Sequence, residues 1–352
     1  MKKILITGVT GQDGSLMADF LLNNYTDIEV YGAQRRLSVP NTQNTKHLLS
    51  NPRFKLIELD VTDSESINSA VAEILPDYFI NFAANSFVGN SWKMPINHMQ
   101  TNAMGVLYCL ESIKNIVPSC RFYNAGSSEQ FGDVDYAPQD IKHPFKPRSP
   151  YGVSKCTAHH LVKVYRESYN LFAVQGILFN HEGVRRGEEF VTRKITKNVA
   201  RIVNAIKYDY KYEPLELGNI NSKRDWSDSE DFVKGVWLML NQQNPKDYVL
   251  SSNETHSIKE FVELSFKFAG VEGKWKGEGI NEKFVLSNYK TEKYFYEDEP
   301  VLMRINSAFY RPAEVELLLG DSTPARTELN WNPEISFEKL VERMTLNDLD
   351  KV

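Results

Sequence analysis

Three residues of this chain have side chains suited to hydride transfer. Tyr151 and Lys155 form a Tyr-x-x-x-Lys pair, and Ser127 lies upstream of them. A free tyrosine, with a pKa of about 10, is a poor base at neutral pH. A neighbouring ammonium group and the positive charge of a nicotinamide ring both favour the phenolate. The set therefore predicts a site where Tyr151 moves a proton during hydride transfer with a nicotinamide cofactor, whose ribose Lys155 can also hold.

Glu129 stands beside Ser127 and is not needed for hydride transfer. Its carboxylate is suited to removing a carbon-bound proton or helping to expel a leaving group. The alternative is a carboxylate that only stabilises a helix N-terminus. The adjacency of Ser127, the usual hydroxyl partner of such a tyrosine, favours the catalytic role. Glu129 therefore predicts a sugar dehydratase rather than an ordinary dehydrogenase.

A second Tyr-x-x-x-Lys match occurs at Tyr289 and Lys293. Tyr151 follows a Ser-Pro dipeptide, which is typical of a helix start, and it shares a helix face with Lys155 at i, i+4 spacing. Tyr289 lies instead in a charged, turn-prone stretch without a cofactor loop nearby. We therefore interpret the second match as a chance occurrence.

The chain begins with a glycine-rich loop at Gly8, Gly11 and Gly14, between an apolar run and a helical pattern. Glycines there permit a tight turn and let backbone N–H groups approach a pyrophosphate at the helix N-terminus. The spacing predicts a dinucleotide-binding loop; the alternative is a purely structural turn.

The end of the second expected strand bears on the choice of cofactor. An NAD-preferring site usually has an acidic residue there, whereas this chain has Arg35 and Arg36. Two arginines suit a 2′-phosphate, which accepts bidentate hydrogen bonds. The pattern favours NADP(H), with a solvated basic turn as the alternative. Asp60, after the third strand, is expected to meet the adenine.

Short apolar runs alternate with helical patterns over much of the chain. This alternation predicts an α/β protein with a Rossmann-type, doubly wound parallel sheet and a smaller, mainly C-terminal domain. Residues 271–282 and 289–299 are turn-prone and charged. Expected strands cover 3–7, 28–32, 55–59, 78–82, 121–124, 173–178 and 248–251, and expected helices cover 15–24, 64–74, 97–117, 154–170, 192–206, 226–240, 257–268, 312–318 and 337–346.

Composition narrows the class of protein. The 352 residues are 41% hydrophobic and 25% charged, which is ordinary for a globular protein, and the net charge of −5 argues against general nucleic-acid binding. No apolar run is long enough to span a membrane, and no signal peptide is expected. The cysteines Cys109, Cys120 and Cys156 lack metal-site spacing, so we expect no metal and a cytoplasmic protein with reduced thiols.

Several stretches of the sequence resemble the extended short-chain dehydrogenase/reductase superfamily and, within it, the GDP-mannose 4,6-dehydratase family. The resemblance covers nearly the whole chain, and its most specific part is the Asn-His-Glu…Arg-Lys-Ile run within residues 176–195. Residues 7–15, 217–226 and 310–321 match almost as well. Generic members of the superfamily lack the Asn-His-Glu run.

The resemblance implies two domains and a set of site residues. An NADP(H)-binding domain would comprise residues 1–182 with 226–255 returning to it, and a nucleotide-sugar-binding domain would comprise 183–225 and 256–352. The implied catalytic residues are Ser127, Glu129, Tyr151 and Lys155. The implied cofactor-binding residues are Gly8, Thr10, Gly11, Gln12, Asp13, Gly14, Arg35, Arg36, Asp60, Val61, Ala83, Tyr151, Lys155, His181 and Arg186. The implied substrate-binding residues are Ser86, Ser127, Asn180, Val191, Lys194, Arg224, Arg311 and Glu314.

The resemblance also implies a reaction and an assembly. Tyr151 and Ser127 would take the proton of the sugar 4-hydroxyl during oxidation at C4 by NADP+, and Glu129 would then remove the C5 proton and help the C6 hydroxyl leave as water. The product would be the GDP-linked 4-keto-6-deoxy sugar. Family members are commonly dimers or tetramers, with the Arg35–Arg36 loop near a neighbouring subunit's cofactor, so a homodimer or homotetramer is expected.

The sequence departs from the family pattern at four positions and in two segments. Ser127 replaces a threonine, Asn85 a glutamine, Phe87 a histidine and Gln130 an apolar residue, and the segments 206–214 and 282–299 are longer than expected. These departures leave GDP-manno-heptose open as an alternative substrate to GDP-mannose. A nucleotide-sugar epimerase or 4-reductase, and a catalytically silent NADP(H)-binding regulator, are further alternatives.

Overall fold

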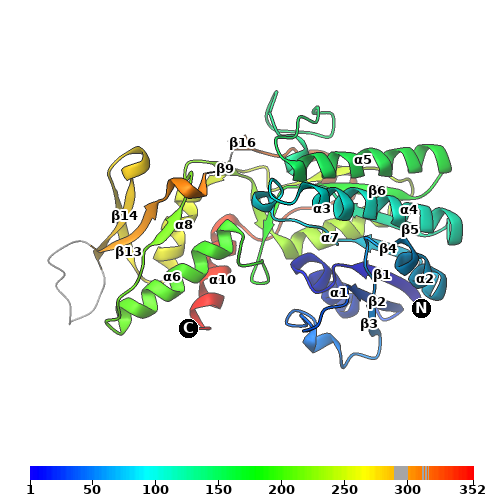
Figure 1. The fold of residues 1–352 in the computed structure, drawn as a ribbon, viewed down its shortest axis with the longest axis horizontal. Coiled ribbons are helices and arrows are strands. Elements are labelled where there is room, and N and C mark those ends of the chain that lie inside the picture. Colours follow the sequence, from blue (N-terminus) through cyan, green and yellow to red (C-terminus); the bar gives the residue numbers. More distant parts are fainter. Residues whose placement is uncertain (289–299, 311–312, 314, 316) are drawn as a thin grey trace.

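The larger part of the molecule is built on a seven-stranded parallel sheet in the order β11-β6-β5-β4-β1-β2-β3 (Figure 1). This computed structural model describes residues 1–288, 300–310, 313, 315 and 317–352. The strand order turns at β1, where β2 and β3 continue on one side and β4 on the other. Ligands of such sheets bind beyond the carboxyl ends of the strands at this point. The strands are β1 (Lys2–Thr7), β2 (Ile28–Gln34), β3 (Phe54–Glu58), β4 (Tyr78–Asn81), β5 (Arg121–Ala125), β6 (Ala173–Leu178) and β11 (Tyr248–Leu250).

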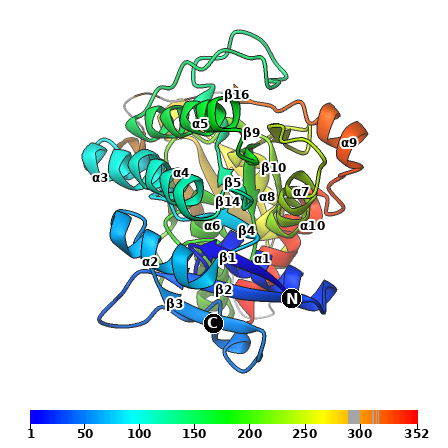
Figure 2. The same cartoon turned by 90° about the vertical axis from the view of Figure 1, so that its right-hand side faces the viewer.

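Helices cover both faces of this sheet, so its central strands are mostly apolar and buried. One core lies between the sheet and the helices α1 (Gln12–Asn24), α7 (Ser229–Leu240) and α9 (Thr323–Leu329). A second core lies on the other face, beneath α2 (Ser64–Ile74), α4 (Gly105–Ile116) and α5 (Pro150–Tyr169). Figure 2 shows α2 and α4 on one side of the strands and α1 and α7 on the other. The predicted Rossmann-type α/β class is confirmed.

The helix expected at residues 97–117 is interrupted. Helix α3 (Pro95–Met99) passes into a π-helical turn (Gln100–Met104) before α4 begins. The turn contains Asn102, which is buried and donates through Nδ2 to the Asn85 carbonyl and to Ser154 Oγ at 3.0 and 3.1 Å. The interruption therefore joins the loop after β4 to helix α5, which carries Tyr151.

A smaller lobe has its own core. Its sheet runs β13-β14-β15-β8, formed by β13 (Glu272–Lys276), β14 (Lys283–Asn288), β15 (Val301–Ile305) and β8 (Leu215–Leu217). The helices α6 (Val191–Lys207), α8 (Ile258–Phe268) and α10 (Phe337–Leu349) pack in the same core. Short strands connect the lobes: β7 (Asn180–Glu182) pairs with β10 (Trp226–Asp228), and β9 (Lys223–Arg224) lies between β12 (His256–Ser257) and β16 (Leu317–Leu318).

Three expectations for this part were wrong. The expected turn at 271–282 begins with strand β13, which packs Trp275 on Phe284 at 4.9 Å between ring centroids and points its other side chains outward. The expected helix at 226–240 begins only at Ser229, because Trp226–Asp228 pairs with β7. In the expected helix at 312–318, the described Leu317–Leu318 pairs with β9 instead. The second Tyr-x-x-x-Lys match lies outside the described residues.

Candidate active site

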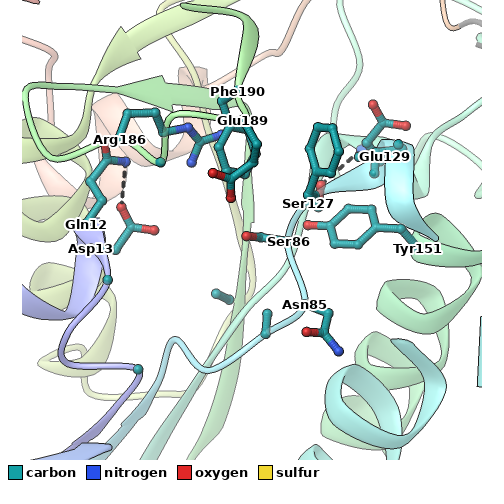
Figure 3. Close-up of a pocket in the computed structure, with 18 of the residues that line it drawn as sticks. Gln12, Asp13, Asn85, Ser86, Ser127, Glu129, Tyr151, Arg186, Glu189 and Phe190 are labelled. Atoms are coloured by element: carbon teal, nitrogen blue, oxygen red, sulfur yellow. Dashed lines mark hydrogen bonds between the residues drawn. The ribbon is translucent and has the colours of Figure 1, made fainter. Parts of the chain in front are cut away.

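A cavity of about 1010 Å³ opens beyond the carboxyl ends of β1, β4, β5 and β6. In Figure 3, Ser127, Glu129 and Tyr151 gather on one side of it, and Gln12, Asp13 and Arg186 lie on the other. Most residues expected in the site line this cavity: Gly8, Thr10, Gly11, Gln12, Asp13, Gly14, Arg35, Asp60, Val61, Ala83, Ser86, Ser127, Glu129, Tyr151, Lys155, Asn180, His181, Arg186, Val191, Lys194 and Arg224.

Three expected residues are not in that group. Arg36 is exposed and does not line the cavity, although its neighbour Arg35 does. Arg311 and Glu314 lie outside the described residues.

The backbone of the glycine-rich loop is packed so closely that a side chain at Gly8 or Gly14 would not fit. Gly8 has a φ of +68°, and a Cβ on Gly14 would lie 2.4 Å from the Gly8 carbonyl oxygen. Helix α1 begins after Gly11, which has no side chain to cap the first N–H groups of the helix. An anion can therefore approach the first N–H groups of the helix, which fits the pyrophosphate of a dinucleotide.

His181 is held by the protein on both sides of its ring. Nδ1 lies 2.8 Å from the Phe179 carbonyl oxygen, and Nε2 lies 2.9 Å from Asp13 Oδ2. A carbonyl and an ionised carboxylate only accept hydrogen bonds, so this geometry favours the imidazolium form, in which both nitrogens donate. Burial disfavours that charge, but the Asp13 carboxylate outweighs burial and raises the pKa of His181. His181 thereby joins the glycine-rich loop to β7 at the cavity wall.

The turn after β5 carries two of the expected catalytic groups. Ser127 precedes a 3₁₀ turn (Ser128–Gln130), and its Oγ accepts a hydrogen bond from the Glu129 N–H at 3.3 Å. The Ser127 hydroxyl also forms a hydrogen bond with Tyr151. One hydroxyl thus contacts both the backbone of Glu129 and the phenol.

Tyr151 and Lys155 are both buried one helical turn apart on α5. Burial raises the pKa of Tyr151 to about 12, although the hydrogen bond from Ser127 opposes the shift. Burial also lowers the pKa of Lys155 to about 8. Lys155 Nζ donates to the Ala125 carbonyl at 2.8 Å and lies 5.8 Å from the centre of the Tyr151 ring. The phenol is therefore protonated at neutral pH until further positive charge reaches the site.

Arg35 is exposed at the rim of the cavity, near Asp60. Asp60 Oδ1 accepts hydrogen bonds from Thr62 N and Thr62 Oγ1 at 2.9 and 2.7 Å, which fixes the turn after β3. Arg35 gives this end of the cavity a positive charge, and the turn after β3 gives it a fixed wall.

Basic side chains line the other end of the cavity. Lys194 Nζ lies 3.6 Å from the centre of the Phe309 ring, and partial burial lowers its pKa. Arg224 is buried beside it in the wall and donates to the Lys223 carbonyl at 2.9 Å. A buried cation facing a cavity is suited to an anionic ligand such as a diphosphate.

Sequence reasoning missed several residues of the cavity wall. Phe190 packs edge-on against Phe87 at 5.9 Å, and the Arg186 guanidinium lies 3.6 Å from the centre of its ring. Glu189 lies beside Phe190 in Figure 3. Both lie within the run 176–195 that carries the family resemblance, but no role was assigned to either of them. Asn102, which is buried behind the wall and holds the Asn85 backbone, had no signal either, because a polar residue within a helical pattern reads as a solvent-facing position.

The fold and the cavity together define a Rossmann-fold protein of the short-chain dehydrogenase/reductase type. A family model described as GDP-mannose 4,6 dehydratase matches residues 5–344. The chain belongs to the GDP-mannose 4,6-dehydratase family.

Curated relatives of this family come from distant organisms. The chain is 43% identical to the GDP-mannose 4,6 dehydratase of Drosophila melanogaster, over 99% of this chain and 86% of the relative. It is 40% identical to the enzyme of Vibrio cholerae serotype O1, over 99% and 94%, and 41% identical to that of Homo sapiens, over 98% and 91%.

Solved structures with this fold are much less similar in sequence. The dTDP-glucose 4,6-dehydratase of Bacillus anthracis, in complex with NAD, gives a TM-score of 0.78 at 19% identity, over 99% of this chain and 96% of that chain. RMD from Pseudomonas aeruginosa, complexed with NADPH, gives 0.76 at 21% identity over both whole chains. These similarities concern the fold alone.

No helix in the described part of the chain has the length and apolar character needed to cross a membrane. Within the same residues, no group of three or more His, Cys, Asp or Glu side chains could hold a metal ion.

Proposed function

We propose that the protein is a GDP-mannose 4,6-dehydratase, which converts GDP-mannose into GDP-4-keto-6-deoxymannose with loss of water. The observation that carries the proposal is the meeting of Ser127, Glu129, Tyr151 and Lys155 in the cavity that also contains the glycine-rich loop. Hydride transfer needs three of these residues, and elimination of water needs an additional carboxylate. The family membership supports the same reaction.

NADP(H) is the cofactor we propose. Its pyrophosphate would lie at the N-terminus of α1, and Arg35 would bind the 2′-phosphate. RMD was solved with NADPH and the Bacillus anthracis dehydratase with NAD, so the fold accommodates either cofactor and Arg35 carries the choice. Lys194 and Arg224 would bind the diphosphate of the substrate, and the active assembly would be a homodimer or homotetramer.

Two residues carry the proton transfers: Tyr151 acts at the 4-hydroxyl, and Glu129 acts at C5 and at the C6 hydroxyl. Bound NADP+ would supply a hydride acceptor for C4 and, once reduced, a hydride donor for C6. Tyr151, with Ser127 beside it, takes the proton of the 4-hydroxyl, and Lys155 stabilises the phenolate. The new 4-ketone acidifies the C5 proton, and Glu129 removes it. Glu129 then gives that proton to the C6 hydroxyl, which leaves as water. C5 finally takes up a proton, balanced by the one that Tyr151 removed from the 4-hydroxyl, and this completes the 4-keto-6-deoxy sugar.

The test compares wild type with Glu129→Gln on GDP-mannose, using NADP+ or NAD+ as the added cofactor. We expect wild type to form a product lighter by one water, with faster turnover on NADP+. Glu129→Gln should lower the rate of water loss by roughly 10²- to 10⁴-fold, because it removes the acid–base group and preserves the size of the side chain. NADPH binding, measured by fluorescence, should survive.

Glu188→Gln is the matched control, because Glu188 pairs with Lys197 outside the cavity. Full turnover by Glu129→Gln would overturn its proposed role, and conversion of GDP-mannose without loss of water would indicate an epimerase or reductase. GDP-manno-heptose is assayed in parallel, since the apolar wall formed by Phe87 and Phe190 makes a larger sugar the second candidate. Faster turnover of the heptose would assign it as the substrate.

A further inference from the structure

A row of buried polar side chains crosses the large sheet beneath the candidate active site. Thr7, Asn81, Asn124 and Gln175 lie directly opposite one another on β1, β4, β5 and β6. Thr7 Oγ1 donates to Asn81 Oδ1 at 2.6 Å, Asn81 Nδ2 to Asn124 Oδ1 at 2.9 Å, and Asn124 Nδ2 to Gln175 Oε1 at 2.7 Å. All four are almost completely buried, so each hydrogen bond replaces contact with water.

The row ends at Gln130, in the turn that carries Ser127 and Glu129. Gln175 Nε2 donates to Gln130 Oε1 at 3.0 Å, and the same oxygen accepts the Ser127 N–H at 3.0 Å. Gln130 itself has no exposed surface. Its amide nitrogen has no hydrogen-bond partner within the described parts of the chain. Gln130 therefore acts through its oxygen, as an acceptor of two hydrogen bonds.

The orientation of every amide in the row follows from one backbone group. The Ser127 N–H can only donate, so Gln130 must present its oxygen to it. Gln175 must then present its nitrogen to Gln130 and its oxygen to Asn124. The same argument orients Asn124 and Asn81 in turn. The turn at Ser127 is thus fixed by a directional network that spans four strands.

The geometry points to Gln130 as a positioning residue for Ser127 and Glu129, with Gln175 holding it in place. The link is direct, because Ser127 Oγ contacts the Glu129 N–H and the Tyr151 hydroxyl. A displaced Ser127 would move the turn that carries Glu129 away from the sugar, whereas Tyr151 is fixed on α5. The inference rests on the proposed dehydratase function, in which Glu129 must reach the C5 proton after Tyr151 has acted at the 4-hydroxyl.

Gln130 and Gln175 allow a test with matched variants. Gln130→Met keeps a side chain of similar length and removes the acceptor. Gln130→Glu keeps an oxygen at the accepting position, so both donors retain their partner. Gln175→Glu makes the same chemical change in the adjacent residue, but in its ionised form it loses the donor and sets two oxygens against each other. Both glutamines are completely buried, so the two Glu variants carry a similar cost of burying a carboxyl group.

Each folded variant is assayed for kcat and KM on GDP-mannose and for reduced cofactor during a single turnover. We expect Gln130→Met and Gln175→Glu to lower kcat roughly 10- to 100-fold through misplacement of the catalytic turn, with little change in KM. Reduced cofactor should accumulate, because the step that uses Glu129 slows more than hydride transfer. Gln130→Glu should retain most of the wild-type kcat. A role confined to folding would lower stability without changing kcat or the accumulation of reduced cofactor.

The inference is overturned if Gln130→Met turns over like wild type, or if Gln130→Glu loses activity while Gln175→Glu keeps it. Should a Glu variant fail to fold, Gln130→Met and its accumulation of reduced cofactor decide alone. A wild-type protein that releases no water from GDP-mannose would contradict the proposed function, and the inference with it. A wild-type-like Gln130→Met contradicts the inference alone.

Discussion

Tyr151 and Lys155 are buried in a way that opposes the charges they need for catalysis. The pKa of Tyr151 rises to about 12 and that of Lys155 falls to about 8, both because burial disfavours the charged form. A phenolate beside an ammonium is the form suited to take a proton from a hydroxyl group. The positive nicotinamide of the proposed cofactor would favour the phenolate. Base strength at Tyr151 should therefore depend on cofactor binding.

Lys155→Met should stabilise the cofactor-free protein while abolishing activity. Because the pKa of Lys155 falls from 10.5 to about 8 on folding, burying its charge costs roughly 3 kcal/mol below pH 8. Loss of the hydrogen bond to the Ala125 carbonyl offsets about 1 kcal/mol of the gain. Urea unfolding at about pH 7 measures the net increase.

The gain from Lys155→Met should also shrink as pH rises from 8 towards 10.5, because folded wild type then sheds the buried proton and unfolded wild type does not. Lys163→Met, at an exposed lysine of the same helix, is the control and should leave stability nearly unchanged. A loss of stability in Lys155→Met at neutral pH would contradict the argument.

At the scale of elements, His181 joins three of them. His181 belongs to β7, its Nε2 donates to the Asp13 carboxylate at the start of α1, and its ring stacks on Phe232 of α7 with 4.7 Å between ring centroids. The pKa of His181 is raised, and that of Asp13 is lowered because His181 outweighs the effect of burial. The pair should therefore stabilise the fold most between the unfolded-state pKa values of the two groups, at about pH 4 to 6.5.

His181→Gln should lower the free energy of unfolding by about 1 to 3 kcal/mol at pH 5.5, and by less at about pH 8.5. The sign follows from the raised pKa of His181: its contribution is complete below the unfolded-state value and is lost as pH rises through the folded-state value. Urea unfolding of the cofactor-free protein at the two pH values measures the difference. His160→Gln, at an exposed histidine, should show no such dependence. An equal loss at both pH values would exclude a charged pair.

The local sequence pattern predicted those helices and strands whose side chains are mostly buried in a core. The strands of the large sheet read as apolar runs because both of their faces are covered, and the loops after β1 and β5 could be recognised by glycines and by the Ser-x-Glu spacing. Strand β13 was missed because Trp275 is its one large apolar side chain, packed on Phe284 of β14. Lys274 and Lys276 on either side give the segment a charged, turn-like composition.

The polar row across the sheet could not be predicted from the sequence. Asn81, Asn124 and Gln175 lie far apart in the chain and meet only through the register of β4, β5 and β6. Within an apolar strand each reads as an isolated irregularity. The departure at Gln130 was visible in the sequence, but its partners depend on long-range pairing.

At the scale of the whole molecule, Asp225 joins segments that are distant in the chain. Asp225 follows β9 and is completely buried. Its Oδ1 accepts from Ser252 N and Oγ at 2.7 and 2.6 Å, and its Oδ2 accepts from Asn253 N and Gly320 N at 3.1 and 3.2 Å. Burial raises the pKa of Asp225 to about 6, so the carboxylate is charged at neutral pH and depends on these donors.

Asp225→Ala should lower the free energy of unfolding by about 3 kcal/mol or more, because three backbone N–H groups lose their acceptor. Asp225→Asn should lose less, since its single amide oxygen can still accept from Ser252 or from the other two donors. Urea unfolding measures both.

The effect of Asp225→Ala should reach the cavity, because Arg224 precedes Asp225 and lines the wall proposed for the diphosphate. We expect the KM for GDP-mannose to rise in Asp225→Ala while NADPH affinity is unchanged, since the glycine-rich loop lies at β1 and α1. A matching loss of NADPH affinity would mean that the substitution disturbs the whole sheet rather than its junction with the smaller lobe.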